Sequence, residues 1–291
     1  MGRLRRFFAV TVAAVFACGA GAVARDRVPS PLAQLRWRSI GPAVSGGRLG
    51  AVAGTNRDPY LYYVGAAGGG VWKSTNAGQT WSPVFDAEDD ASIGAIAIDP
   101  QNTNVVWVGT GEAAPRNDVI EGDGVYLTRD GGKTWRHVLA LPDTLVAKIL
   151  IDPVDPQRIL VGVLGDPFAA SPQRGVYRTT DGGKTWSKTL YLAPDTGVSD
   201  MADAAKAPGV VYAGLWEFRR TGWSLQSGGP HDGLYESTDF GGTWTKLAGH
   251  GLPSGEEGRI GIAVAPSNPK RVYQRAAQCS GHTASPAVGW W

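Results

Sequence analysis

The chain has 291 residues and a nearly even charge balance, with 28 basic and 26 acidic side chains. This length is enough to bury a substantial core without covalent cross-links, and the two cysteines give no disulfide framework. The four histidines are dispersed without metal-ligand spacing. We therefore predict no metal site and no cofactor.

The N-terminal residues 1–24 have the pattern of a secretory signal, with basic residues, an apolar run and a small-residue cleavage site. The apolar run is too short to span a bilayer, so we expect no transmembrane span in the mature chain. Removing the three arginines of this segment leaves 25 basic against 26 acidic residues, and we expect no nucleic-acid partner. The expected location is periplasmic or secreted, with lipoprotein anchoring at Cys18 as the less favoured alternative.

Four near-identical octets organise the rest of the chain, at residues 74–81, 128–135, 179–186 and 237–244. Each reads hydroxyl, any residue, Asp or Asn, any residue, Gly, any residue, Thr, Trp. The closing tryptophans recur every 51 to 58 residues. A period of this length predicts a repeated supersecondary unit that buries its apolar faces only against its neighbours.

The chemistry of the octet is that of a hairpin turn. Its Asp or Asn accepts backbone N–H bonds, its Gly supplies a positive φ, and its Trp packs between neighbouring units. The predicted structural residues are Asn76, Asp130, Asp181, Asp239, Trp81, Trp135, Trp186 and Trp244. The octet resembles the Asp-box, or BNR repeat, of sialidases, sortilin-type receptors and two-propeller xyloglucanases. In those families the box is a structural turn opposite the ligand-binding face.

Each unit also holds four short strands. In the second unit they are predicted at residues 93–98, 105–108, 124–127 and 135–139. The same order repeats in the other units, with a weak first strand in the fourth unit near residues 200–204. No helical period is visible after the signal. The predicted fold class is all-β, a β-propeller of four-stranded antiparallel blades with Asp-box turns over residues 37–273, preceded by a linker at residues 25–36.

The predicted ring is incomplete, with four blades plus part of a fifth. Residues 259–264 and 271–273 match the first two strands of a blade, but residues 274–291 carry no further strand or Asp-box. This tail is either a native arm or the product of a truncated or frameshifted reading frame, and the second is favoured. Residues 35–40 resemble an outer blade strand without its turn, and we expect them to act as the closing strand of the last blade. The missing blades would come from a longer chain or from self-association.

Short loop motifs within this span resemble those of bacterial BNR-repeat glycosyl hydrolases, also described as sortilin N-terminal-domain proteins. The motifs lie at residues 40–42, 68–73, 109–112, 115–117 and 227–230. The resemblance implies carbohydrate hydrolysis, although fold analogy is weak support for an activity. Xyloglucanases of similar fold carry a catalytic Asp where this chain has Ala67, and the arginine triad of a sialidase is not visible.

Three acids follow the second strands of successive units and are expected on one face. Glu112 and Glu217 lie three residues beyond a strand-ending glycine, and Asp166 lies four residues beyond the equivalent glycine. A glycosidase needs two carboxyl groups across the scissile bond, so these residues are the catalytic candidates. The alternative is structural: they cap loops or pair with arginines at positions 116, 219 and 220.

Long loops on the same face supply the predicted ligand-binding residues, because exposed Trp beside Arg suits a sugar or a peptide. They are Arg116, Asn117, Trp216, Arg219, Arg220, Trp223, His231 and Asp232. A structural alternative is that the two tryptophans fasten a long loop to its blade. Two functions remain open. The favoured one is an exported, sortilin-like platform for a peptide, protein or carbohydrate ligand, and the other is a glycoside hydrolase.

Overall fold

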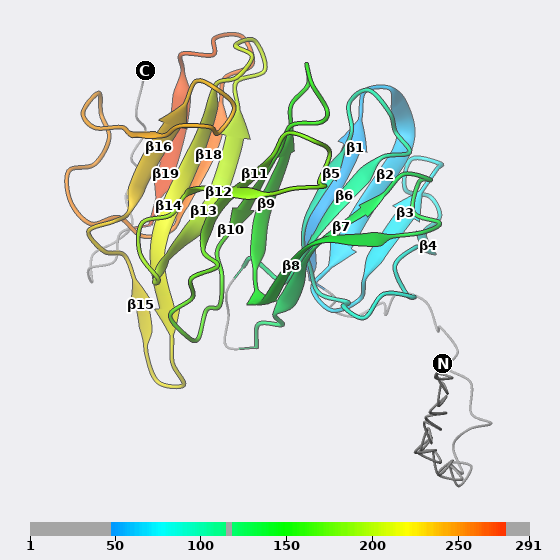
Figure 1. Ribbon diagram of the computed structural model, residues 1–291, viewed down its shortest axis with the longest axis horizontal. Coiled ribbons are helices and arrows are strands. Elements are labelled where there is room, and N and C mark those ends of the chain that lie inside the picture. Colours follow the sequence, from blue (N-terminus) through cyan, green and yellow to red (C-terminus); the bar gives the residue numbers. More distant parts are fainter. Residues whose placement is uncertain (1–47, 115–117, 278–291) are drawn as a thin grey trace, which may run out of the picture. The chain divides into compact units, whose positions relative to one another are not determined.

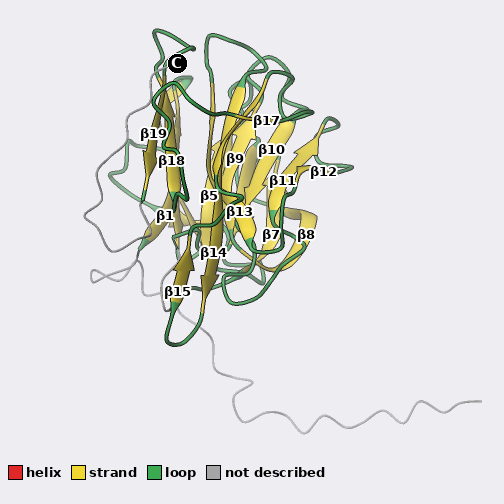
Figure 2. Cartoon of the chain, turned by 90° about the vertical axis from the view of Figure 1, so that its left-hand side faces the viewer, coloured by secondary structure: helices red, strands yellow, loops and turns green. Residues whose placement is uncertain are grey.

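The computed structural model describes residues 48–114 and 118–277, all within one compact unit that spans residues 42–291. The described residues form strands and loops and contain no helix (Figure 2). A membrane-spanning helix is therefore not found among them. The predictions for residues 1–24, 25–36, 37–40, 115–117 and 278–291 lie outside this part of the chain.

The strands form four sheets of four strands or more and one two-stranded sheet. Blade 1 holds β1 (Leu49–Thr55), β2 (Asp58–Ala66), β3 (Val71–Ser74) and β4 (Ser82–Pro83). Blade 2 holds β5 (Ile93–Ile98), β6 (Val106–Thr110), β7 (Gly122–Thr128) and β8 (Arg136–Thr144). Blade 3 holds β9 (Val146–Ile151), β10 (Ile159–Val163), β11 (Gly175–Thr179) and β12 (Ser187–Leu190). Blade 4 holds β13 (Thr196–Asp203), β14 (Val211–Arg220), β15 (Leu225–Ser227), β16 (Gly233–Ser237) and β17 (Thr245–Lys246). Two further strands, β18 (Ile260–Val264) and β19 (Val272–Ala276), begin a fifth blade.

Within each blade the strands pair in chain order and run antiparallel. The first strand of each blade lies against the first strand of the next, so β1, β5, β9, β13 and β18 succeed one another along the inner edge. Figure 1 shows the blades following one another from blue to red. This confirms the predicted all-β propeller with four-stranded blades and an incomplete ring.

The core lies between the blades, which explains why the second strands are buried on both faces. Every residue of β6 and β10 is buried. Each second strand carries a glycine where the next blade approaches: a Cβ at Gly109 would lie 2.3 Å from Cγ1 of Val146, and one at Gly65 would lie 2.3 Å from Cγ2 of Ile93. The glycines therefore set how closely successive blades stack.

The Asp-box turns are held together by bonds within each octet. One carboxylate oxygen of Asp130 accepts the backbone N–H groups of Lys133 and Thr134, both at 2.9 Å. The other accepts the hydroxyl of Thr134 at 2.6 Å. These bonds, led by the Thr134 hydroxyl, hold the pKa of Asp130 well below its usual range. Asp181 and Asp239 make the same bonds in their own turns.

The box tryptophans connect neighbouring blades. The indole N–H of Trp135 donates to the carbonyl oxygen of Val84 in blade 1, at 2.6 Å. Trp186 donates in the same way to Val138 of blade 2, at 3.0 Å. A cation also reaches from each of blades 1 to 3 to the Asp-box turn of the next blade, as Lys73 does to the carbonyl oxygen of Gly131 at 2.9 Å. The octets thus form one rim of the molecule, the Asp-box end.

Blade 4 differs from the sequence prediction. Its first strand starts at Thr196, before the predicted residues 200–204, and its second strand continues to Arg220, within the residues interpreted as a loop. The extension pairs with β15, placing Phe218 opposite Ser227 and Arg220 opposite Leu225. The prediction missed this ribbon, β14 with β15, because the polar residues between the strands resemble an ordinary loop.

Candidate functional site

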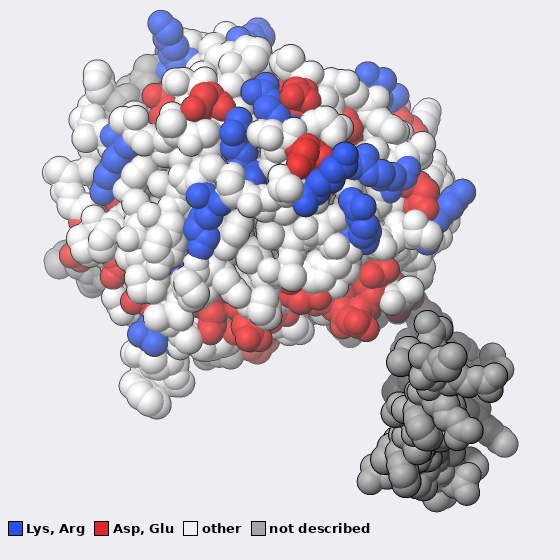
Figure 3. Space-filling model, in the orientation of Figure 1, with Lys and Arg blue, Asp and Glu red and all other residues white. Residues whose placement is uncertain are grey.

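The opposite rim, the loop end, is where second strands finish and third strands begin. Its loops differ from blade to blade, and acidic side chains gather along this lower edge of the molecule in Figure 3. Of the three predicted catalytic acids, Glu112 and Asp166 follow the ends of β6 and β10, whereas Glu217 lies within the lengthened β14. Each of them has bonding partners within the protein.

Glu112 is buried and held by Arg48. The guanidinium Nε donates to Oε1 of Glu112 at 2.7 Å, and Nη2 donates to Oε2 at 2.6 Å. The remaining Nη1 lies 3.3 Å from a carboxylate oxygen of Asp118. Because Glu112 is only 1% exposed and both of its oxygens are used, its carboxylate acts as an anchor between blades 1 and 2.

Asp166 lies at the start of the blade 3 loop, where it accepts the backbone N–H groups of Phe168 at 2.7 Å and Ala169 at 3.1 Å. It also meets Glu121 of blade 2, a residue that sequence reasoning did not select. Partial burial is the main cause that raises the pKa of Glu121, and the negative charges of Asp166 and Asp143 raise it further. Only the contact between blades could reveal this pair.

Beside Glu121 is an acidic cavity of about 510 Å³. Its acidic lining residues are Asp89, Asp90, Glu121, Asp123 and Asp143. Burial raises the pKa of Asp90, and the backbone N–H of Ser92 acts against that rise. Asp123 accepts the hydroxyl of Tyr126 at 2.6 Å. Across the described ranges, no group of three or more His, Cys, Asp or Glu side chains is arranged to hold a metal ion.

Glu217 and Asp232 fix the base of the blade 4 ribbon. Asp232 accepts the backbone N–H of Glu217, and its second oxygen accepts that of Gly229 at 2.9 Å. Burial is the main cause that raises the pKa of Asp232 to about 7. The side chain of Glu217 accepts a bond from Gln226 at 3.2 Å and lies 3.3 Å from Nδ1 of His231. These predicted site residues are therefore neighbours, and they stabilise the ribbon.

The two tryptophans of this region have different environments. Trp216 is buried, packs on Phe218 with 4.3 Å between ring centroids, and donates its indole N–H to Ser227 at 3.1 Å. Trp223 lies at the turn of the ribbon and is 91% exposed. The turn between β14 and β15 extends below the neighbouring loops in Figure 1. Trp216 thus fastens the ribbon, whereas Trp223 is free to contact a ligand.

The ribbon also carries the two predicted arginines. Arg219 is 3.9 Å from Asp195, a distant pairing that leaves its guanidinium accessible. Arg220 donates its backbone N–H to the carbonyl oxygen of Pro167 in blade 3, at 2.7 Å. The other two predicted ligand-binding residues, Arg116 and Asn117, lie outside the described residues.

Comparison with known proteins places the chain among propellers of two kinds. Residues 69–194 match the model of the family described as sortilin, neurotensin receptor 3. The xyloglucanase Xgh74A of Acetivibrio thermocellus is 26% identical over 277 residues, which covers 83% of this chain and 30% of the enzyme. A vacuolar protein sorting/targeting protein 10 of Sordaria macrospora is 30% identical over 112 residues, covering 38% of this chain and 7% of that protein. The chain is a β-propeller related to sortilin and to xyloglucanases.

A solved structure supports the same fold for this propeller. The crystal structure of an ancestral GH74 enzyme matches with a TM-score of 0.62 and 22% identity, covering 83% of this chain and 29% of that one. This likeness concerns the fold alone. The chain spans less than a third of the length of the curated relatives described above, so an activity of those whole proteins is not transferred to it.

Proposed function

We propose that the protein is an exported propeller that binds a peptide, protein or glycan at its loop end. The observation that carries this proposal is Trp223, 91% exposed at the turn of the β14–β15 ribbon. Leu225 beside it is 51% exposed, and Arg219 and Arg220 follow on the paired strand. Tryptophan and arginine are the residues that most often dominate binding energy at interfaces. Export rests on the signal-like residues 1–24.

The rigid base of the ribbon supports the same function. Trp216 and Asp232 lock it to blade 4, so Trp223 is presented at little entropic cost. A ligand that covers Trp223 would remove a large apolar ring from water while its polar groups meet the arginines. The same arrangement suits a sugar ring or an aromatic peptide side chain.

A glycoside hydrolase is the second candidate, favoured by the similarity to xyloglucanase over most of the chain and by the carboxyl pair of Glu121 and Asp166. Two features weigh against it. Ala67 stands where the resemblance would require an Asp, and Glu112 is occupied by Arg48. We therefore rank the binding platform first.

The test compares Trp223→Ala with Tyr60→Ala. Tyr60 is a matched control because it is 61% exposed but lies beside the first Asp-box turn, at the other rim. Binding to a glycan array and a peptide array is measured for each variant. We expect Trp223→Ala to lose most binding and Tyr60→Ala to keep it. Unchanged binding by Trp223→Ala, together with xyloglucan cleavage abolished by Asp166→Asn, would favour the hydrolase instead.

A further inference from the structure

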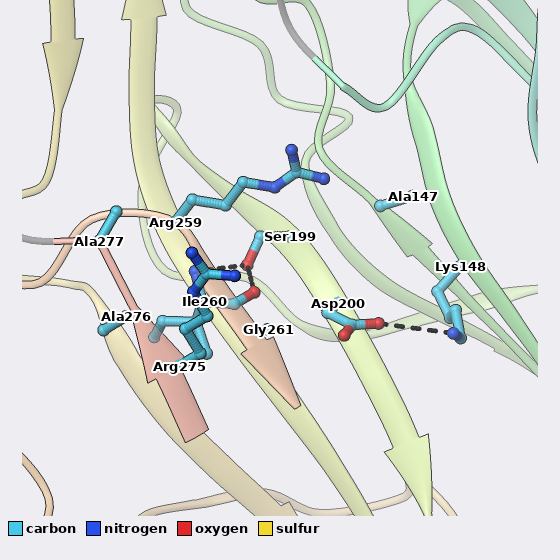
Figure 4. A pocket seen from close by; sticks show the side chains of 10 residues that line it. All are labelled: Ala147, Lys148, Ser199, Asp200, Arg259, Ile260, Gly261, Arg275, Ala276 and Ala277. Atoms are coloured by element: carbon cyan, nitrogen blue, oxygen red, sulfur yellow. Dashed lines mark hydrogen bonds and ion pairs between the residues drawn. The ribbon is translucent and has the colours of Figure 1, made fainter. Parts of the chain in front are cut away.

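A second cavity lies on the inner strands of blades 3, 4 and 5, with a volume of about 830 Å³. It opens where β18 begins and β19 ends, so it is near the loop end but separate from the ribbon. Its lining residues are Ala147, Lys148, Ser199, Asp200, Arg259, Ile260, Gly261, Arg275, Ala276 and Ala277 (Figure 4). Cavities of this volume suit small ligands.

The charges of the lining are unevenly compensated. Asp200 forms an ion pair with Lys148 at 3.5 Å and accepts the backbone N–H of Ile262 at 3.0 Å. Its carboxylate therefore neutralises Lys148 (Figure 4). Three cations and one acid line the space, so two positive charges remain without an acidic partner of their own.

The two remaining cations are Arg259 and Arg275. Arg259 makes one bond to the carbonyl oxygen of Ala113, at 3.3 Å, and no ion pair with a described residue. The side chain of Arg275 makes neither a hydrogen bond nor an ion pair with any residue in the described ranges. Both side chains are accessible to solvent. Partial burial of Arg259 in the cavity lowers the pKa of its guanidinium, and the negative charge of Asp200 opposes this shift. Their donors are available to a ligand.

The floor of the cavity is open at Gly261, which pairs across the sheet with Arg275. A Cβ on Gly261 would meet no atom within 4 Å, and its φ lies outside the left-handed region. The space in front of Gly261, beside Arg275, is therefore not filled by another side chain. A larger residue at position 261 would fill this space without disturbing the backbone.

We propose that this cavity binds a small hydroxylated monocarboxylate of the uronic acid type, with Arg259 and Arg275 as the groups that attract its carboxylate. Guanidinium groups match the planar geometry of a carboxylate. Asp200 in the wall disfavours a dianion such as phosphate, because a second negative charge on the ligand would be repelled. Lys148 and Asp200 are a donor and an acceptor for ligand hydroxyl groups.

Calorimetric titration with glucuronate tests the proposal, with glucose as the uncharged counterpart and inorganic phosphate as the competing oxyanion. We expect glucuronate to bind, glucose not to bind, and phosphate to bind more weakly. Binding should weaken as NaCl is raised from low to high concentration. Tighter binding of phosphate, equal binding of glucose, or no binding of glucuronate would each overturn the proposal.

Three variants locate the site. Arg275→Gln should weaken glucuronate binding about tenfold, the effect of losing hydrogen bonds to a charged group. Gly261→Leu should abolish it by filling the cavity. The charge-matched control Arg136→Gln, on the exposed outer strand β8, should bind like the wild type. Because Arg275 has no described partner to lose, its variant should fold normally, and unchanged binding by Arg275→Gln contradicts the assignment.

Discussion

The two rims of the propeller use acidic residues in different ways. At the Asp-box end, successive turns are nearly identical, and each carboxylate is satisfied by bonds within its own octet. At the loop end every blade differs, and several of its acids meet partners from other blades or from distant parts of their own blade. Repetition here marks the turns that build the fold, and variation marks the surface available for function.

Glu112 gives the strongest test of this contrast, since it lies at the loop end but is held like a structural residue. Glu112→Ala removes a buried carboxylate from Arg48 and should lower the free energy of unfolding by about 3 kcal/mol. That figure is at the low end for a broken buried pair, because Arg48 is partly exposed and regains water. Urea denaturation measures the change. The exposed Glu256→Ala should be neutral, and equal stabilities would mean that Glu112 is not an anchor.

Gly109 tests the packing on which both rims depend. Gly109→Ala places a Cβ 2.3 Å from Val146 and should destabilise the protein by about 2 kcal/mol through overpacking. Gly222→Ala is the control, because a Cβ there meets nothing within 4 Å. Thermal unfolding compares the two variants. A Gly109→Ala protein as stable as the wild type would show that the blades can separate at no cost.

Asp181 tests the Asp-box end. Asp181→Ala should lower the melting temperature at pH 7 and leave ligand binding per folded molecule unchanged, because the turn lies on the rim opposite the ribbon. The native bonds hold the pKa of Asp181 below its usual value, so its stabilising effect is present above about pH 4 and fades as pH falls further. The difference in melting temperature should shrink accordingly. Loss of binding in a variant of native stability would contradict the structural assignment.

Asp232 should show the opposite pH dependence, with a smaller effect. Its pKa is raised to about 7 in the folded protein, whereas an exposed Asp titrates near 3.9. Between these values the folded state binds more protons than the unfolded state, so stability should fall as pH rises from about 4 to 7. Asp232→Asn removes this titration, and its melting temperature should change less over the same range. Parallel pH profiles for both proteins would exclude Asp232 as the cause.

Local sequence was enough to predict the strands and the Asp-box turns. The bonds of an Asp-box join residues no more than four positions apart, so their pattern is visible in a single octet. An apolar run with β-branched residues, followed by turn residues, likewise placed a strand at residues 93–98, where the structure has β5. The ribbon was missed because its second strand has only three residues, and its pairing depends on the lengthened β14.

Which acids are engaged by other side chains depends on contacts between segments far apart in the chain. Arg48 and Glu112 are 64 residues apart in the chain, and Glu121 meets Asp166 across a blade boundary. The cavity lined by Arg259 and Arg275 combines side chains from three blades, and its Lys148 and Arg275 are separated by more than half of the propeller sequence. Such contacts depend on how tightly one blade stacks on the next, and no spacing in the sequence records that distance. The repeating unit is therefore encoded locally, in single octets and strands, whereas the side-chain contacts between units arise from how the units stack.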